Sequence, residues 1–167
     1  KRGKDDDTVQ TLVHELRYPA TTNPARLAAE IGKRHDTAHM SVVFSTYHSI
    51  DTIAQAQQQH GLAGFDLIIC DEAHRTTGVT LADGDDSAFV RVHNNATIRA
   101  DKRLYMTATP RLFNDKIKDS AKEKDAVLCS MDDKSIYGPV FHKLGFGKAV
   151  SLGLLTDYKV VVLGVPE

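Results

Sequence analysis

Two adjacent carboxylates and a histidine follow an apolar run in FDLIICDEAHRTTG, residues 65–78. Asp71 and Glu72 come directly after the run, and His74 stands two positions beyond Glu72. Paired acids at a strand end suit nucleotide hydrolysis, because one carboxylate can hold magnesium through water while the other deprotonates the attacking water. The charge of the ion would offset the first carboxylate and let the second act as a base. Such pairs also occur in solvated turns and in the first turn of helices, so the pair alone leaves both interpretations open.

Strand signals occur at four places in the chain. They are β-branched, aromatic or almost continuously apolar, and they cover residues 41–46, 65–70, 103–108 and 159–165. The runs at 65–70 and 103–108 lack polar alternation, so we expect both faces of these strands to be covered, as in a parallel sheet. The glycine- and aspartate-rich segment 76–87 is predicted to be a surface loop, since its aspartates lack the spacing of a calcium-binding loop.

Helix signals lie between the strand signals. Asn23 followed by Pro24 predicts a capped helix that ends near Gly32. Ser49 is the expected cap of a second helix that ends near Gly61. Further helical stretches are expected at 114–125 and from residue 145 onward. This alternation predicts an α/β domain with a mostly parallel sheet, whose ligands bind at the carboxyl ends of the strands.

Composition restricts the class of protein. A chain of 167 residues is long enough for one compact domain with a real core. Its hydrophobic fraction of 41% and charged fraction of 26% are ordinary for a soluble protein, and no apolar run approaches the ~20 residues of a membrane span. A net charge of −1 gives no overall bias toward nucleic acid or membrane. Two cysteines are too few for a disulfide framework, so a reducing, cytoplasmic compartment is expected.

Both ends of the chain suggest a piece of a longer protein. The chain begins with Lys1, and residues 1–7, KRGKDDD, are predicted to be a solvated linker. At the other end, DYKVVVLGVPE runs from a strand-like stretch into the chain terminus without closing a unit. We therefore expect further domains elsewhere in the polypeptide.

Two motifs carry a family resemblance. Asp-Glu-Ala-His at 71–74, preceded by a hydrophobic strand, resembles motif II of the superfamily 2 helicases and translocases, the DEAH-type Walker B box. Further along, MTATPR contains Thr107 and Thr109 and resembles motif III, again at a strand end. The two motifs occur in the expected order and at the expected separation, which makes the resemblance specific.

Two upstream segments resemble parts of these motors that contact nucleic acid. VVFSTY, with Thr46, resembles the strand and threonine motif that touches the nucleic-acid backbone. YPATTNP, with Thr21 and Thr22, is similar to the preceding backbone-contacting turn, although this match is weaker. All three hydroxyls would then donate to phosphate oxygens, contacts that position DNA without reading its sequence. A helix-capping role for Thr22 or Thr46 is the alternative, and Tyr47 is expected to pack in the core.

The sequence around the motifs narrows the resemblance to restriction enzymes. The segments DEAHRTTG, LYMTATPRLF and SMDDKSIYGPVFHKLGFGKAVSLGLLTDYKVVV resemble the helicase-type ATPase of the single-polypeptide type I group (type ISP) and related predicted helicases. The likeness extends from about residue 8 onward. It implies a RecA-like three-layer fold, ATP and Mg²⁺ as cofactors, and a motor that couples ATP hydrolysis to movement on double-stranded DNA. It also implies a second RecA-like domain, a nuclease and a methyltransferase elsewhere in the polypeptide.

The resemblance assigns a role to each residue of the two motifs. Asp71 would hold magnesium through water, and Glu72 would be the catalytic base. His74 would link the ATP site to Thr107 and Thr109, whose hydroxyls would couple hydrolysis to domain movement.

Two parts of the family pattern are expected to lie outside this chain: the phosphate-binding loop and the second RecA-like domain with its arginine finger. No phosphate-binding loop of the form G-x-x-x-x-G-K-[ST] occurs in the chain, and GFGKA at 145–149 lacks the spacing and the hydroxyl residue. We therefore expect residues 8–155 to be the C-terminal part of the first RecA-like domain, motifs Ib to III, without its phosphate-binding strand and helix. Residues 156–167 would lead toward the second RecA-like domain, and the chain alone is expected to be inactive.

Two other classes of protein fit the same residues. A metal-dependent hydrolase could use Asp71, Glu72 and His74 as direct ligands, but that interpretation gives motif III no purpose. A catalytically idle nucleic-acid-binding or interaction module could keep a degenerate motor fold, and substitution of Glu72 in the complete protein would separate it from a motor.

Overall fold

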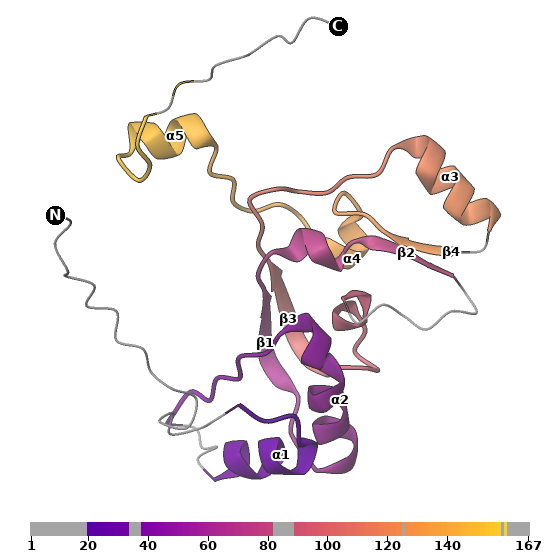
Figure 1. Ribbon diagram of the computed structural model, residues 1–167, viewed down its shortest axis with the longest axis vertical. Coiled ribbons are helices and arrows are strands. Elements are labelled where there is room, and N and C mark those ends of the chain that lie inside the picture. The colour runs from indigo at the N-terminus through magenta and orange to yellow at the C-terminus, as the bar shows by residue number, and fades with distance from the viewer. Residues whose placement is uncertain (1–19, 34–37, 82–88, 125, 158, 160–167) are drawn as a thin grey trace, which may run out of the picture. The chain divides into compact units, whose positions relative to one another are not determined.

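The computed structural model describes residues 20–33, 38–81, 89–124, 126–157 and 159 (Figure 1). The chain divides into two compact units, Lys1–Tyr137 and Gly138–Glu167, and each is described by itself. The linker expected at 1–7 and nearly all of the strand expected at 159–165 lie outside the described residues. The domain boundaries proposed from the sequence remain predictions.

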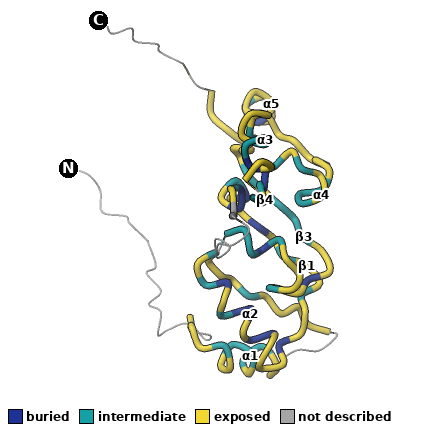
Figure 2. The backbone as a smooth tube through the Cα atoms, turned by 90° about the vertical axis from the view of Figure 1, so that its right-hand side faces the viewer, coloured by how far each residue is buried: buried dark blue, intermediate teal, exposed yellow. Residues whose placement is uncertain are grey.

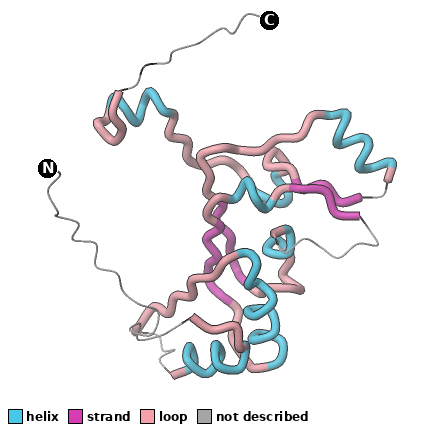
Figure 3. The backbone as a smooth tube through the Cα atoms, in the orientation of Figure 1, coloured by secondary structure: helices cyan, strands magenta, loops and turns pink. Residues whose placement is uncertain are grey.

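Two parallel strands form the centre of the first unit. β1 (Phe65–Cys70) pairs with β3 (Ala100–Tyr105), in a register that runs from Phe65 opposite Ala100 to Cys70 opposite Tyr105 (Figure 3). The carboxyl ends of the two strands therefore meet at one edge. The predicted α/β class with a parallel sheet is confirmed. The strand expected at 103–108 begins earlier, at Ala100, and ends at Tyr105.

One face of this pair packs on a core that α2 (Ile50–Gln59) supplies together with the loops around the sheet. α1 (Pro24–Gly32) lies against α2, and Figure 2 shows buried positions along α2. The buried core residues are Ile50, Ile53, Ala54, Ala56, Leu62, Cys70, Ala73, Val92 and Ile98. Cys70 is the buried thiol that the sequence predicts, and burial raises its pKa to about 11.

The other face of β1 is not covered by any described element, so the expectation that both faces are covered was wrong for these residues. Leu67 is 48% exposed and Ile69 is 57% exposed. Ile68 and Cys70, which alternate with them, pack on the core. An apolar run thus predicts a strand here, but composition alone does not supply the element that would cover its second face.

The strand expected at 41–46 is also absent, since these residues form no ladder in the structure. The segment keeps the alternation of a strand: Val43 packs against the core while Val42 and Phe44 are exposed. β-branched residues favour an extended backbone, but a ladder needs a neighbouring strand that local sequence does not specify. The segment leads into the short helix η2 (Tyr47–Ser49).

α1 begins with the cap that the sequence predicts, whereas α2 lacks its predicted cap. The Asn23 side chain accepts from the Arg26 N–H at 3.0 Å, and Pro24 occupies the first helical position, as predicted. Ser49 makes no capping bond, because its hydroxyl pairs with the Thr46 hydroxyl at 3.2 Å. α2 ends at Gln59, just before Gly61 as expected, where φ is 72° and glycine is favoured.

A second, antiparallel pair corrects part of the predicted loop at 76–87. β2 (Gly78–Leu81) pairs with β4 (Ala126–Cys129), and α3 (Asp115–Glu123) packs on β4. Glycine-rich composition suggested a loop, but a partner strand far along the chain provides the ladder. The helix α4 (Lys134–Tyr137) closes the first unit.

In the second unit, α5 (Phe146–Ser151) begins after Gly145, so GFGKA is the start of a helix as predicted. Ala149 is its buried residue, and the Leu154 N–H donates to the Ala149 carbonyl at 3.0 Å. No helix among the described residues is both long and apolar enough to cross a membrane.

Candidate functional site

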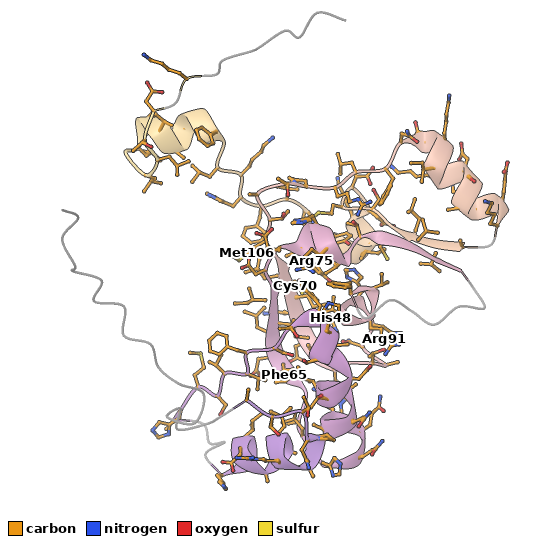
Figure 4. All side chains as sticks on the ribbon, viewed as in Figure 1. His48, Phe65, Cys70, Arg75, Arg91 and Met106 are labelled. Atoms are coloured by element: carbon orange, nitrogen blue, oxygen red, sulfur yellow. The ribbon has the colours of Figure 1, made fainter. Side chains whose placement is uncertain are left out.

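The carboxyl edge of β1 and β3 brings the two motif segments together. Past the strands, the Met106 N–H donates to the Cys70 carbonyl and the Ala73 N–H donates to the Met106 carbonyl, both at 2.9 Å. Figure 4 shows Cys70 and Met106 close together at this edge. The segment after β3 is thereby fixed against the turn after β1, which carries Asp71 and Glu72.

Hydrogen bonds hold both the side chain and the main-chain carbonyl of Asp71. Its Oδ1 accepts from the Glu72 N–H at 2.9 Å, and its main-chain carbonyl accepts from the Tyr47 phenol at 2.8 Å. Burial is the main cause that raises the pKa of Tyr47, followed by the neighbouring Cys70, so the phenol keeps its proton and remains a donor. The Asp71 carboxylate is exposed and oriented by its neighbour.

Glu72 occupies a left-handed backbone conformation, with φ 50° and ψ 44°. Among the residues that the structure describes, it is the only non-glycine residue with positive φ. Such conformations cost of order 1–3 kcal/mol and concentrate at functional sites. Here the conformation turns the chain from β1 into the short helix η3 (Ala73–Thr76).

His74 joins the two motifs through one nitrogen. Its Nδ1 lies 3.0 Å from the Thr107 hydroxyl, 3.3 Å from the Thr109 hydroxyl and 3.2 Å from the Glu72 carboxylate. The Thr109 N–H also donates to the Thr107 hydroxyl at 3.1 Å. One ring nitrogen cannot bond all three oxygens at once, so His74 has competing partners in motif II and motif III. The structure therefore brings together five residues that the sequence predicts: Asp71, Glu72, His74, Thr107 and Thr109.

The three threonines expected to contact DNA lie further from this cluster. Thr46 is exposed and precedes η2, and it is connected to the site through Tyr47, whose phenol reaches Asp71. Thr21 accepts from the Asn23 N–H at 3.1 Å in the turn before α1, where Thr22 is exposed. The cap of α1 is Asn23 and not Thr22, and the side chain of Thr46 makes no capping bond to η2.

The carboxylates of motif II lie outside any cluster of metal-ligating side chains in the described residues. Within the described part of the chain, no group of three or more His, Cys, Asp or Glu side chains is arranged to hold a metal. Asp71 nevertheless offers an exposed, oriented carboxylate, the oxygen ligand that Mg²⁺ prefers when it keeps most of its waters. The side chain of His74 meets the hydroxyls of motif III.

The sequence analysis did not predict the contacts that support motif II through Tyr47 and Thr76. It expected Tyr47 to pack in the core, which is confirmed, but not that its phenol would hold Asp71. It gave no role to Thr76, two residues after His74, which is fully buried. The polar pair Thr76-Thr77 directly after the motif was the available signal, because buried hydroxyls require partners.

The parallel strands β1 and β3 thus bring the paired carboxylates and the two threonines to one edge. Residues 6–112 match the family model described as type III restriction enzyme, res subunit, and the chain belongs to this family. The resemblance to a helicase-type restriction enzyme motor, drawn from the sequence, is thereby confirmed.

Similar viral proteins agree with the family. The chain is 28% identical over 161 residues to the probable helicase A859L of African swine fever virus, Tick/Malawi isolate, across 96% of this chain and 15% of the viral protein. The same helicase of the Pig/Kenya isolate is 27% identical over 162 residues, across 97% and 15% of the two chains.

Solved structures of type ISP restriction-modification enzymes are also similar. A nuclease-deletion mutant of LlaGI in complex with a DNA substrate mimic is 42% identical, with a TM-score of 0.62 over 85% of this chain. The ATP-dependent enzyme LlaBIII bound to DNA is 45% identical, with the same TM-score of 0.62 and coverage of 85%. The chain spans only 10% of each of these enzymes.

Proposed function

We propose that this chain is the part of an ATP-dependent motor that carries motifs II and III, and that the complete protein is a restriction-modification enzyme that moves on double-stranded DNA. The observation that carries the proposal is the position of His74, 3.2 Å from the Glu72 carboxylate and 3.0 Å from the Thr107 hydroxyl. A contact of this kind is what a motor needs to relate hydrolysis to movement. The two type ISP structures, one of an ATP-dependent enzyme and both with DNA or a DNA mimic, support the same activity.

The carboxylates would act on ATP. Asp71 would hold Mg²⁺ through water, and the ion would supply positive charge that stabilises the phosphoryl group being transferred. The Glu72 N–H, which donates to Asp71 at 2.9 Å, keeps that carboxylate in place. Glu72 would take the proton of the attacking water, and its left-handed backbone fixes the base relative to Asp71.

His74 would report hydrolysis to the rest of the motor. Its Nδ1 has a carboxylate partner in Glu72 and hydroxyl partners in Thr107 and Thr109. A change in the protonation of Glu72 during the reaction changes which of these partners is preferred. Motif III would thereby respond to the state of the ATP site.

The DNA contacts would come from Thr46, Thr21 and Thr22, whose hydroxyls suit phosphate oxygens. Tyr47 connects the first of these to catalysis, because its phenol donates to the Asp71 carbonyl. The second RecA-like domain, the nuclease and the methyltransferase would be partners within the same cytoplasmic polypeptide.

Replacement of the base tests this function. In the complete protein, Glu72→Gln should leave ATP binding intact and lower DNA-stimulated turnover by ~10²–10⁴, the factor typical of a lost general base. The matched control is Glu123→Gln, the same change at an exposed position in α3, which should not alter the rate. An unchanged rate in Glu72→Gln would favour an idle interaction module, and a tightly bound transition metal in the purified protein would favour a metal-dependent hydrolase.

A further inference from the structure

The turn that carries the motif II residues has one short and one long main-chain hydrogen bond of its own, and the Thr77 hydroxyl also donates to the His74 carbonyl at 2.7 Å. Within η3 the Arg75 N–H donates to the Glu72 carbonyl at 2.9 Å, whereas the Thr77 N–H reaches the His74 carbonyl only at 3.4 Å. The turn also begins at the strained Glu72. A short 3₁₀ helix with these features needs support from outside, since its own geometry is poor.

Further support comes at the C-terminal end of the turn, from residues distant in the sequence. Thr76 is fully buried, and its hydroxyl donates to the Ala73 carbonyl at 2.8 Å. Because this bond uses the only proton of the hydroxyl, Thr76 must accept the hydrogen bond that joins it to the Tyr137 phenol at 3.0 Å. Tyr137 is the last residue of α4 and lies 61 positions further along the chain.

A half-buried histidine holds the main chain of the same residue. His93, the last residue of the short helix η4 (Val90–His93), has its Nε2 3.0 Å from the Thr76 carbonyl. A carbonyl only accepts, so Nε2 must carry a proton. In the neutral ring Nδ1 is then an acceptor, and the Tyr105 phenol, 2.8 Å away, donates to it. One arrangement of protons thus satisfies every group.

The three rings also pack on one another. The centroids of His93 and Tyr137 are 5.0 Å apart, those of Tyr105 and Tyr137 4.8 Å, and those of His93 and Tyr105 5.4 Å. Edge and tilted contacts at these distances are favourable for aromatic rings. Elements η4, β3 and α4 therefore converge on Thr76.

We propose that Tyr137 and His93 are positioning residues for ATP hydrolysis, which hold Thr76 and thereby fix the turn that presents Glu72 and His74 to the ATP site. The inference rests on the proposed function. Tyr137 orients the turn through the Thr76 hydroxyl, and His93 orients it through the Thr76 carbonyl. Neither residue touches the nucleotide.

The protonation states agree with this arrangement. Burial is the main cause that lowers the pKa of His93, and nearby Arg103 lowers it further, so the ring is neutral at neutral pH. Burial raises the pKa of Tyr137 to about 12, which keeps its phenol a donor. The pKa of Tyr105 is raised as well, again mainly by burial.

The first experiment removes one phenol in the complete protein. Tyr137→Phe keeps the ring contacts and leaves the Thr76 hydroxyl without its donor. We expect kcat for DNA-stimulated ATP hydrolysis to fall about 10-fold with an unchanged KM for ATP, since small misplacements of catalytic groups are costly. Ile98→Val, a conservative change at a core residue that is 2% exposed, is the control for lost stability and should leave kcat unchanged.

A double variant separates positioning from stability. If Tyr137 acts through Glu72, then Tyr137→Phe should cost nothing further in the Glu72→Gln background, measured by single-turnover hydrolysis. An equal loss in both backgrounds would overturn the positioning role. The two proposals fail separately: no effect of Glu72→Gln contradicts the proposed function, whereas an effect of Glu72→Gln without one of Tyr137→Phe contradicts only this inference.

A second pair of variants applies if Tyr137→Phe does not fold. Thr76→Ser keeps the hydroxyl and should retain kcat within about 3-fold, a smaller change than that expected for a lost contact. Thr76→Val keeps the shape and removes the hydroxyl, and it should show the roughly 10-fold loss. Equal activity of the Ser and Val variants would overturn the proposal.

Discussion

Glu72 combines backbone strain with the proposed chemistry at a single residue. Its φ of 50° is unfavourable for a side chain with a Cβ, yet the conformation is what directs the chain from β1 into η3. The Ala73 N–H, bonded to the Met106 carbonyl at 2.9 Å, and the buried Ala73 side chain hold the far side of the strained residue. Strain of this kind persists where surrounding contacts impose it.

Substitutions at Glu72 should therefore separate stability from catalysis. Asn tolerates the left-handed region, so Glu72→Asn should be at least as stable as the natural protein. Val does not, and Glu72→Val should lower the free energy of unfolding by ~1–2 kcal/mol. Both variants should lose ATP hydrolysis, because neither has a carboxylate. Equilibrium urea unfolding makes the comparison, and equal stability of the two variants would show that the backbone there is not strained.

His93 gives the fold a dependence on pH. Burial lowers its pKa in the folded state below the ordinary 6.5, so the unfolded chain takes up a proton at a pH where the folded chain does not. As pH falls below 6.5 the contribution of this residue therefore destabilises the fold, and as pH rises toward 6.5 stability returns. The groups around the ring are the Thr76 carbonyl, the phenols of Tyr105 and Tyr137, and Arg103.

The measurement is unfolding by urea at pH 5.5 and at pH 7.5. The natural protein should be less stable at the lower pH, and His93→Gln should reduce the difference between the two values. His60→Gln, at an exposed histidine after α2, is the control and should leave the difference as it is. A pH dependence that His93→Gln leaves unchanged would contradict the assignment.

At the scale of elements, helix caps give a direct contrast. Asn114 caps α3, with its side-chain oxygen 3.0 Å from the Ile117 N–H, while Ser49 makes no capping bond at the start of α2. Asn114→Ala should therefore cost about 1 kcal/mol of stability, within the ~0.5–2 kcal/mol range of lost caps. Ser49→Ala should cost clearly less. Thermal unfolding of the two variants tests this, and the reverse order would show that Ser49 is the more important cap.

Local signals predicted local structure well. Asn23 and Pro24 predicted the start of α1, and the apolar run at 65–70 predicted β1, because each rests on residues near in sequence. β2 could not be predicted this way, since its ladder depends on β4, more than forty residues away. The strand predicted at 41–46 was wrong for the opposite reason. Its residues favour an extended backbone, but no described strand pairs with them.

The site shows the same division. The sequence motifs indicated which residues lie at the edge of the sheet. The structure brings together Asp71, Glu72, His74, Thr107 and Thr109. The Tyr47 bond to Asp71 spans 24 positions and the Tyr137 bond to Thr76 spans 61. Neither contact has a local pattern, because a buried hydroxyl finds its partner only when the chain has folded.

At the scale of the molecule, the described residues would supply one side of the proposed ATP site. Asp71 and Glu72, the proposed catalytic carboxylates, lie with His74 and the motif III threonines at one sheet edge. The sequence contains no G-x-x-x-x-G-K-[ST] loop, whose backbone and lysine grip the phosphates. In phosphoryl transfer, catalysis is almost wholly positioning and charge stabilisation. A general base such as Glu72 is therefore effective only when a phosphate-binding loop holds the phosphates in place.

The 167-residue chain by itself should therefore bind ATP weakly and not hydrolyse it at a useful rate. Asp71 and Glu72 cannot replace a phosphate-binding loop or an arginine from a second domain, which contributes ~10³–10⁵ in rate. A steady-state phosphate-release assay with Mg²⁺ and duplex DNA checks this, with a longer polypeptide that adds a glycine-rich phosphate-binding segment and a second RecA-like domain as the comparison. The longer polypeptide should hydrolyse ATP and should lose that activity on Glu72→Gln. Vigorous DNA-stimulated hydrolysis by the 167-residue chain, abolished by Glu72→Gln, would show that its phosphate-binding residues lie within the chain in a form other than the expected loop.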